Sequence, residues 1–188
     1  LADLGGAWDL DAVTGALTRF ADAAVAASLT SAARGEVEAG RLTALGPTSG
    51  GDGQHGPVPG FFCIAMGKQG AFELNYSSDI DVSVFFDPDL LEPVLAEGVE
   101  PLAFAVRLTQ RVSDLMQART ADGYVFRMDL RLRPDPSSTP PAMPVPAALE
   151  YYETVGQNWE RAAFIKARAC AGDRVAAADF LGELVPYI

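Results

Sequence analysis

The sequence predicts an α+β fold, in which a small mixed sheet is flanked by helices, with helical segments at both ends. Residues 80–86 and 126–132 alternate apolar and polar side chains, which is the period of a half-buried strand. Residues 61–66 form a short apolar run typical of a buried strand, and residues 94–119 carry apolar side chains at helical spacing. The 188 residues are 49% apolar, which is enough for one sizeable core.

The chain divides into three segments by composition. Residues 1–45 are Ala-rich with apolar side chains at helical spacing, which predicts one or two helices broken near Gly35 or Gly40. Residues 46–60 hold six Gly and three Pro and predict a flexible loop. Residues 61–188 contain the predicted strands and further helices, so we expect them to form the main domain.

The first half of the main domain is predicted to run strand, glycine turn, strand, helix. The run 61–66 leads into Gly67, and the strand 80–86 ends at Asp87-Pro88. Asp79, Asp81 and Ser83 lie on the polar face of that strand. The helix over 94–119 has one apolar stripe, made of Leu102, Ala105, Thr109, Val112, Leu115 and Met116.

The second half begins with a turn at Asp122-Gly123 and a second alternating strand. Residues 134–146 contain six prolines, so we expect a loop with little regular structure. Helices are predicted over 147–155 and 157–169, and Asp173 is a candidate cap for a last helix that reaches Leu181. The polar face of the alternating strand carries Arg127, Asp129, Arg131 and Arg133.

Three acidic residues in this pattern suggest metal-dependent phosphate chemistry. Asp79 and Asp81 are two positions apart in an extended segment, so their side chains point to the same side. They could hold one or two divalent cations, and Asp129 on a neighbouring strand would complete the site. Gly67 and Lys68 offer backbone N–H groups and a positive charge to phosphates. An Asp-x-Asp pair alone also occurs as surface acids or turn caps. The chemistry is suggested by the combination of this pair with the glycine turn and a third aspartate.

The net charge of −11 argues against non-specific binding to nucleic acid or to acidic membranes. The charge is uneven, because residues 1–126 carry 17 acids against 7 bases. Residues 127–168 carry six bases against 5 acids. Such an Arg-rich segment fits a pocket for an anionic ligand, and ordinary surface salt bridges would give the same pattern.

Cys63 and Cys170 lie in apolar surroundings without metal-ligand spacing, so we expect buried, reduced thiols in a cytoplasmic protein. The printed sequence contains no apolar run of membrane-spanning length and no signal-peptide pattern. Leu1 in place of Met suggests a fragment of something longer.

The order of these features resembles the DNA-polymerase-β-like nucleotidyltransferase fold. Three runs are informative, AMGKQGAFELNYSSDIDV, FRMDLRLRP and LEYYETVGQNWERAAFIKARACAGD. They resemble the bifunctional glutamine synthetase adenylyltransferase/adenylyl-removing enzymes, and the similarity covers about residues 60–175. Gln69 and Ala71 depart from the family's usual Leu and Gly, so the packing of the glycine turn is expected to differ from that of the family.

The resemblance implies roles for the matching positions. Asp79, Asp81 and Asp129 would hold two Mg²⁺ or Mn²⁺ ions. Phosphates of the nucleotide or inorganic phosphate would contact Gly67, Lys68, Ser78, Arg131 and Arg133. For Arg133 a salt bridge to Glu150 or Glu153 is the alternative.

Other residues in the matching runs are expected to be mainly structural. Glu73 and Asn75 would hold the geometry of the glycine turn. The aromatic side chains Tyr151, Tyr152 and Trp159 are expected to pack helices rather than stack on adenine. One or two of four charged residues would line the cleft and the rest would form ion pairs; these are Glu160, Arg161, Lys166 and Arg168.

The resemblance implies removal of AMP from a tyrosine of glutamine synthetase by phosphorolysis, which yields ADP. The order Met128-Asp129-Leu130-Arg131 is similar to that of the removing half of these enzymes. The alternatives are the half that adds AMP from ATP, a uridylyltransferase of the PII signalling protein, and an inactive regulatory module. The implied partners are glutamine synthetase, ATP or ADP and inorganic phosphate, with PII acting through other parts of a longer chain.

Overall fold

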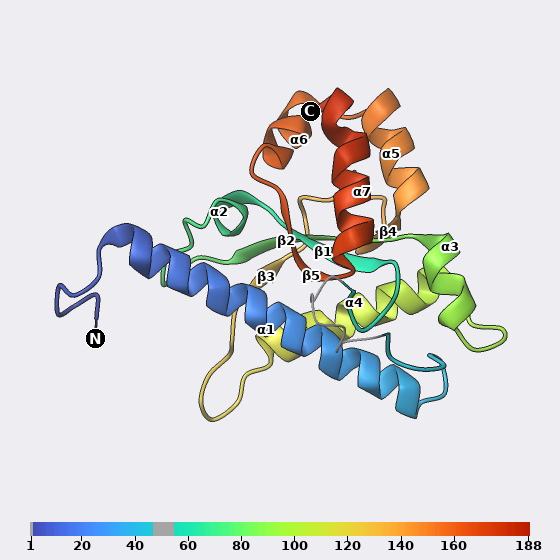
Figure 1. Ribbon diagram of the computed structural model, residues 1–188, viewed down its shortest axis with the longest axis horizontal. Coiled ribbons are helices and arrows are strands. Elements are labelled where there is room, and N and C mark those ends of the chain that lie inside the picture. Colours follow the sequence, from blue (N-terminus) through green and yellow to red (C-terminus); the bar gives the residue numbers. More distant parts are fainter. Residues whose placement is uncertain (1, 47–54) are drawn as a thin grey trace.

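The computed structural model describes residues 2–46 and 55–188, which form an α+β unit around a five-stranded mixed sheet (Figure 1). The strand order is β3-β2-β1-β5. β3 pairs with the first residues of β2, and β4 pairs with its last residues, Val84 to Phe86. The predicted class and the small mixed sheet are confirmed. Most of the predicted loop 46–60 lies outside the described residues. The strands are β1 (Phe61–Ala65), β2 (Ile80–Phe86), β3 (Met128–Asp129), β4 (Ala142–Pro144) and β5 (Arg168–Gly172).

Helices cover both faces of the sheet, with α1 and α4 below it and α5, α6 and α7 above it in Figure 1. The short α2 and α3 follow β1 and β2, and 3-10 turns lie at Glu92–Val94 and Val185–Tyr187. Among the described residues, no helix is both long and apolar enough to cross a bilayer. The helices are α1 (Leu10–Glu38), α2 (Gly67–Gly70), α3 (Pro88–Leu91), α4 (Pro101–Gln117), α5 (Val145–Thr154), α6 (Asn158–Phe164) and α7 (Arg174–Leu184).

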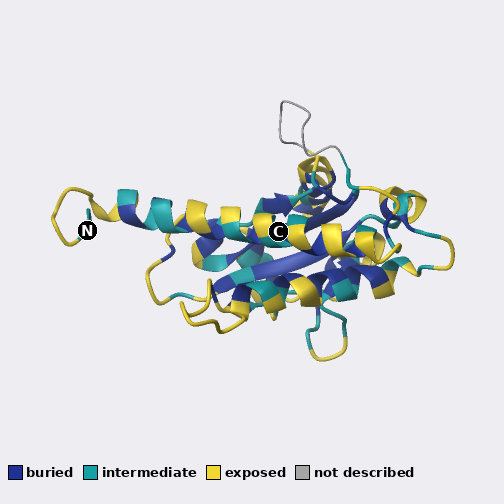
Figure 2. Ribbon diagram, turned by 90° about the horizontal axis from the view of Figure 1, so that it is seen from below, coloured by how far each residue is buried: buried dark blue, intermediate teal, exposed yellow. Residues whose placement is uncertain are grey.

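The N-terminal segment is a single helix, and its first turns extend beyond the rest of the molecule (Figure 2). Asp9 caps α1 by accepting a hydrogen bond from the Ala12 N–H at 2.8 Å. The helix passes through Gly35 and ends before Gly40, whose φ of +68° is the left-handed conformation common after a helix. Of the two predicted break points, Gly40 is therefore confirmed.

The sheet separates two apolar cores. Alternate residues of β1 face opposite ways, so Phe61 and Cys63 pack with α1 and α4 while Phe62 and Ile64 pack with α5, α6 and α7. The prediction that 80–86 is a half-buried strand is wrong for most of its length, because α7 covers its second face. Phe85 shows this directly, since its ring centroid lies 4.5 Å from that of Phe180.

The strand predicted over 126–132 is only two residues long, Met128–Asp129, because the chain turns away from β2 at Leu130. Arg133 stabilises this turn by donating hydrogen bonds to the backbone carbonyls of Leu130, Pro136 and Thr139. The proline-rich segment also contains β4, a strand that the sequence analysis did not predict.

The predicted helix over 157–169 ends at Phe164, and Arg168–Gly172 forms β5 instead. β5 pairs antiparallel with β1, and the Cys170 thiol donates to the Cys63 carbonyl at 3.4 Å. Both thiols are buried as expected, and burial raises the pKa of Cys63 to about 12. The helix predicted over 94–119 begins only at Pro101, and Leu102 of its predicted stripe is exposed.

Candidate active site

The backbone places Asp81 and Asp129 side by side. β2 and β3 run parallel with Asp81 opposite Asp129, so both side chains leave the sheet on the same side. The Ile80 N–H donates to the Arg127 carbonyl at 2.9 Å, which extends this pairing by one residue. The expected arrangement of these two residues on neighbouring strands is confirmed. Asp79 lies one residue before β2 begins.

Gly67 lies close to the Asp81 carboxylate. The Met66 N–H donates to the Asp81 carbonyl at 2.9 Å, which holds the start of α2 against β2. Gly67 has a φ of +52°, and a Cβ atom there would lie 2.6 Å from Asp81 Oδ2. A glycine is therefore required by both conformation and space.

Two open hollows meet at this place. One, of about 350 Å³, lies over the start of α2, and the other, of about 380 Å³, lies over β3. Asp79 and Arg127 line both hollows, so they form one continuous surface. The first also contains Gly67, Lys68, Ser77, Ser78 and Asp81, and the second Gln117, Met128, Asp129, Leu130 and Arg131.

The pKa of Asp81 is raised, first by burial and then by the nearby carboxylates of Asp129 and Asp79. Arg131 and Lys68 oppose this rise through their positive charges. Asp81 therefore lies at the centre of a group of charges that any phosphate or cation would meet.

Two arginines neutralise the other two carboxylates. The Arg127 Nε donates to Asp79 Oδ1, and its Nη2 donates to the Ser77 carbonyl at 3.0 Å. The Arg131 side chain binds Asp129 through Nη2 at 2.5 Å and Nε at 3.0 Å. These hydrogen bonds are the main cause of the lowered pKa of Asp129.

The donor set suits a hard cation, because it consists of carboxylate oxygens. Within residues 2–46 and 55–188, however, no three His, Cys, Asp or Glu side chains are arranged to hold a metal ion. The reason is geometric, since Asp79 faces Arg127 and Asp129 faces Arg131. The metal-binding role of the three aspartates stays a prediction, and it requires Asp79 and Asp129 to exchange Arg127 and Arg131 for the cation.

The other predicted phosphate contacts differ in their surroundings. Ser78 lines the first hollow, where its hydroxyl donates to Asn75 Oδ1 at 2.8 Å. Asn75 thus holds the loop, as expected. The guanidinium of Arg133 is engaged by backbone carbonyls, and no salt bridge to Glu150 or Glu153 is present among the described residues. Its role as a phosphate ligand stays a prediction.

Three of the charged residues in the last matching run form structural contacts. Glu160 is buried and accepts hydrogen bonds from the Tyr151 hydroxyl at 3.1 Å and the Gln157 N–H at 2.8 Å. Lys166 pairs with Glu73 at 3.1 Å. Arg168 pairs with Asp22 at 2.7 Å and lies over the Phe72 ring, 4.0 Å from its centroid. None of these residues, nor Arg161, is among those that line the two hollows.

The sequence analysis did not identify Arg127 as a site residue. Its prediction for Trp159 is wrong. Arg127 belongs to the predicted polar face that also holds Asp129, so its spacing was a signal that it could reach the site. Trp159 was expected to pack against a helix, but its side chain is 52% exposed. Tyr152 is buried between helices, as expected.

Comparison with known proteins gives a consistent result along the chain. The family described as Glutamate-ammonia ligase adenylyltransferase matches residues 1–183. The chain is 64% identical over all 188 residues to the bifunctional glutamine synthetase adenylyltransferase/adenylyl-removing enzyme of Caulobacter vibrioides. The enzymes of the same name from Bradyrhizobium sp. (strain ORS 278) and Rhodopseudomonas palustris (strain BisB5) are 54% and 51% identical over the whole chain. The chain spans 18% of the length of each of these curated relatives.

Proposed function

Because the chain belongs to the glutamate-ammonia ligase adenylyltransferase family, we propose that it removes AMP from an adenylylated tyrosine of glutamine synthetase by phosphorolysis. One observation carries the proposal: Asp81 and Asp129 lie in register on β2 and β3, and Lys68 lines the same hollow as Asp81. Carboxylates next to fixed positive charges are what a nucleotidyltransferase site of the DNA-polymerase-β-like kind requires.

The reaction consumes inorganic phosphate and the adenylylated tyrosine. A phosphate oxygen forms a bond to the adenylyl phosphorus, the bond from that phosphorus to the tyrosine oxygen breaks, and the products are ADP and tyrosine. Phosphate is already anionic near neutral pH, so the reaction requires no strong general base. This agrees with the absence of His from the residues that line the two hollows.

The residues of this chain would act by binding and by electrostatics. Lys68 and Arg131 would neutralise phosphate oxygens, while Gly67 lets the backbone approach closely; Ser78 and Arg133 are further candidate contacts. Asp79, Asp81 and Asp129 would hold Mg²⁺ or Mn²⁺, which when bound supplies positive charge that stabilises the developing charge on phosphorus-bound oxygens.

We favour removal over addition of AMP because Leu130 follows Asp129, as in the removing half that the sequence resembles. The names of the relatives combine both activities. A cytoplasmic location fits two buried thiols that remain reduced. ATP and the PII protein are further expected partners, with PII acting through other parts of the longer relatives.

The test is to incubate the purified protein with adenylylated glutamine synthetase, phosphate and Mg²⁺ and to measure ADP release. Asp81→Asn should lower the rate at least about 100-fold, because it removes a charge at the reacting centre. Asp89→Asn, at an exposed position on α3, is the matched control and should keep the wild-type rate.

Other outcomes select the alternatives. AMP transfer from ATP to unmodified synthetase, without ADP release from the modified form, would assign the adding half. Neither reaction, together with no Mn²⁺ binding in isothermal titration, would favour the inactive regulatory module. Mn²⁺ binding that is lost in Asp79→Asn and Asp81→Asn would support the active enzyme.

A further inference from the structure

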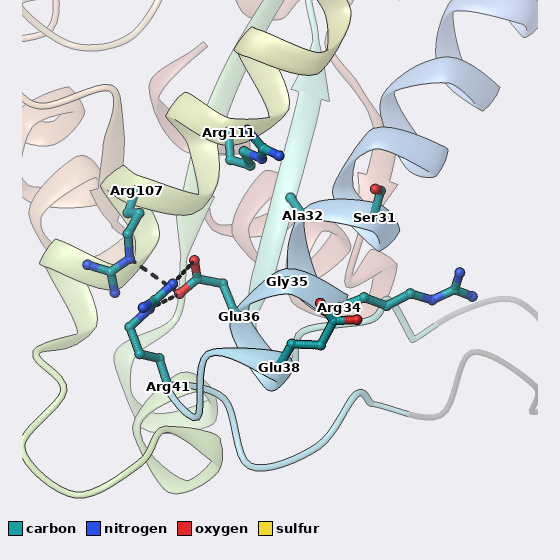
Figure 3. Close-up of a pocket in the computed structure, with 9 residues that line it drawn as sticks. All are labelled: Ser31, Ala32, Arg34, Gly35, Glu36, Glu38, Arg41, Arg107 and Arg111. Carbon is teal, nitrogen blue, oxygen red and sulfur yellow. Dashed lines mark hydrogen bonds and ion pairs between the residues drawn. The ribbon is translucent and has the colours of Figure 1, made fainter.

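A larger hollow, of about 570 Å³, lies between the C-terminal half of α1 and the middle of α4 (Figure 3). Small residues of α1 form part of its wall. Ala32 offers only a methyl group, and a Cβ atom at Gly35 would meet no atom within 4 Å. The rest of the lining is charged and includes four arginines, whereas none of the three candidate catalytic aspartates lines it.

One arginine is enough to neutralise the buried carboxylate in this hollow. Glu36, with a side chain 7% exposed, accepts two hydrogen bonds from Arg41, at 2.7 Å from Nε and 2.9 Å from Nη2. This is the bidentate geometry that satisfies a carboxylate best. Arg107 adds a longer contact to the same carboxylate, with its Nε 3.3 Å from Oε2.

Arg107 and Arg111 exceed what Glu36 needs. They lie four residues apart on one face of α4, where two like charges destabilise a helix. The Arg111 side chain makes no hydrogen bond or ion pair with any residue in the described part of the chain. Favourable interaction with a helix C-terminus does not explain the pair, because α4 continues to Gln117.

The arrangement leaves an excess of positive charge in an acidic protein. In Figure 3 Arg41 and Arg107 contact the Glu36 carboxylate, Arg111 lies one turn further along α4, and Arg34 extends away from them. The four arginines that line the hollow face two carboxylates, those of Glu36 and Glu38, which leaves two uncompensated positive charges. A phosphate dianion matches this charge, and its oxygens match the planar donors of arginine.

We propose that the hollow formed by Arg41, Arg107 and Arg111 is a second anion site that binds a phosphate group, either free phosphate or a small phosphate ester. The site goes beyond the proposed function, since it shares no residue with the two hollows around Asp79 and Arg127. Glu36 fixes Arg41 and Arg107 so that their remaining N–H groups can meet the anion.

The experiment titrates inorganic phosphate, and separately glycerol 3-phosphate, into the purified protein in EDTA, followed by calorimetry and by the amide NMR signal of Gly35. Saturable binding that shifts the Gly35 signal is expected for at least one of the two, and the tighter one identifies the source. Arg111→Met, which removes no contact among the described residues, should weaken binding at least about tenfold. Arg111→Lys should give an intermediate affinity, because it keeps the charge without the planar donors.

Two controls distinguish this site from the one around Asp79, Asp81 and Asp129. Arg119→Met removes an exposed arginine near α4 and should bind as the wild type does. Lys68→Met removes a charge next to Asp81, and it should leave the anion-dependent shift of the Gly35 signal unchanged. The proposal is overturned if neither anion binds saturably, or if Arg111→Met binds as tightly as the wild type. Loss of the Gly35 shift in Lys68→Met, with the shift retained in Arg111→Met, would also overturn it and would assign the anion to the site around Asp81. None of these outcomes depends on whether the protein releases ADP.

Discussion

Gly67 combines a left-handed backbone with a close approach to Asp81 Oδ2. Gly67→Ala adds a methyl group that must displace either the start of α2 or the Asp81 carboxylate. We expect a loss of activity of at least about 100-fold, because small displacements at a reacting centre are costly. The left-handed conformation alone should lower the free energy of unfolding by about 1–2 kcal/mol. Rate measurements and urea unfolding of the same protein give both quantities.

Gly98 provides the matched control, since its φ is +78° and a Cβ atom there would meet nothing within 4 Å. Gly98→Ala should show the same loss of unfolding free energy with an unchanged rate. Equal activity in the two variants would mean that the contact between Gly67 and Asp81 is not important for the reaction.

Glu36 makes stability depend on pH. Its hydrogen bonds to Arg41, the largest cause, hold its pKa below the ordinary value. A carboxyl with a lowered folded-state pKa contributes stability above its unfolded pKa of about 4.3, and this contribution is lost as pH falls through the folded value. Glu36→Gln should therefore lower the unfolding free energy by about 1–3 kcal/mol at pH 7. The difference from the wild type should shrink below about pH 4 in urea unfolding.

Glu38→Gln is the control for this prediction, because Glu38 is exposed and forms no ion pair among the described residues. It should change stability by less than about 0.5 kcal/mol at either pH. If the Glu36→Gln difference is the same at pH 7 and pH 3.5, the Arg41 pair does not stabilise the fold.

At the scale of the residue, the period of two in the sequence was enough to place Asp81 and Asp129 together. The same pattern could not show which partner each carboxylate takes. Asp79 pairs with Arg127 across neighbouring strands, and Asp129 pairs with Arg131 where the chain turns after β3. The contact between Arg127 and Asp79 spans 48 residues of the chain, and a contact of this length leaves no local signal.

At the scale of the element, the predictions fail where pairing overrides propensity. Arg168–Gly172 is rich in Ala and lacks alternation, so its local pattern favours a helix. It becomes a strand because the edge of β1 offers hydrogen bonds over its whole length. Helices with strong caps were predicted well, and α7 begins after Asp173 as expected.

The cap of α7 makes a prediction at this scale. Asp173 is buried and accepts hydrogen bonds from the Val175 and Ala176 N–H groups and, across the molecule, from the Gly60 N–H at 3.1 Å. Asp173→Ala should lower the unfolding free energy by about 2–3 kcal/mol, since three donors lose their acceptor. Asp9→Ala removes an exposed cap with one bond to Ala12 and should cost about 0.5–1 kcal/mol. Similar losses in the two variants would show that the Gly60 contact contributes nothing.

At the scale of the whole molecule, Arg168 joins three parts of the chain. It pairs with Asp22 of α1, and it donates to the carbonyls of Gln69 and Gly70 in α2, the element that begins at Gly67. Arg168→Lys keeps the charge but cannot make all these bonds, so we expect about 2–3 kcal/mol less unfolding free energy. Hydrogen exchange at the Gly70 and Ala71 amides should also become faster.

Arg174→Lys is the control for this change, since Arg174 is exposed at the start of α7. Its unfolding free energy should stay within about 0.5 kcal/mol of the wild type. Unchanged exchange at Gly70 in Arg168→Lys would show that α2 is held by β1 and β2 alone.

The position of β1 between β2 and β5 has a consequence for synthesis on the ribosome. Cys63 and Cys170 lie on paired strands although 107 residues separate them in the chain. At a translation rate of about 5–20 residues per second, β1 leaves the ribosome roughly 5–20 seconds before β5. During that interval one edge of its apolar sequence Phe61–Ala65 stays unpaired and can associate with other nascent chains. A chaperone that binds β1 would prevent this until Gly172 has emerged.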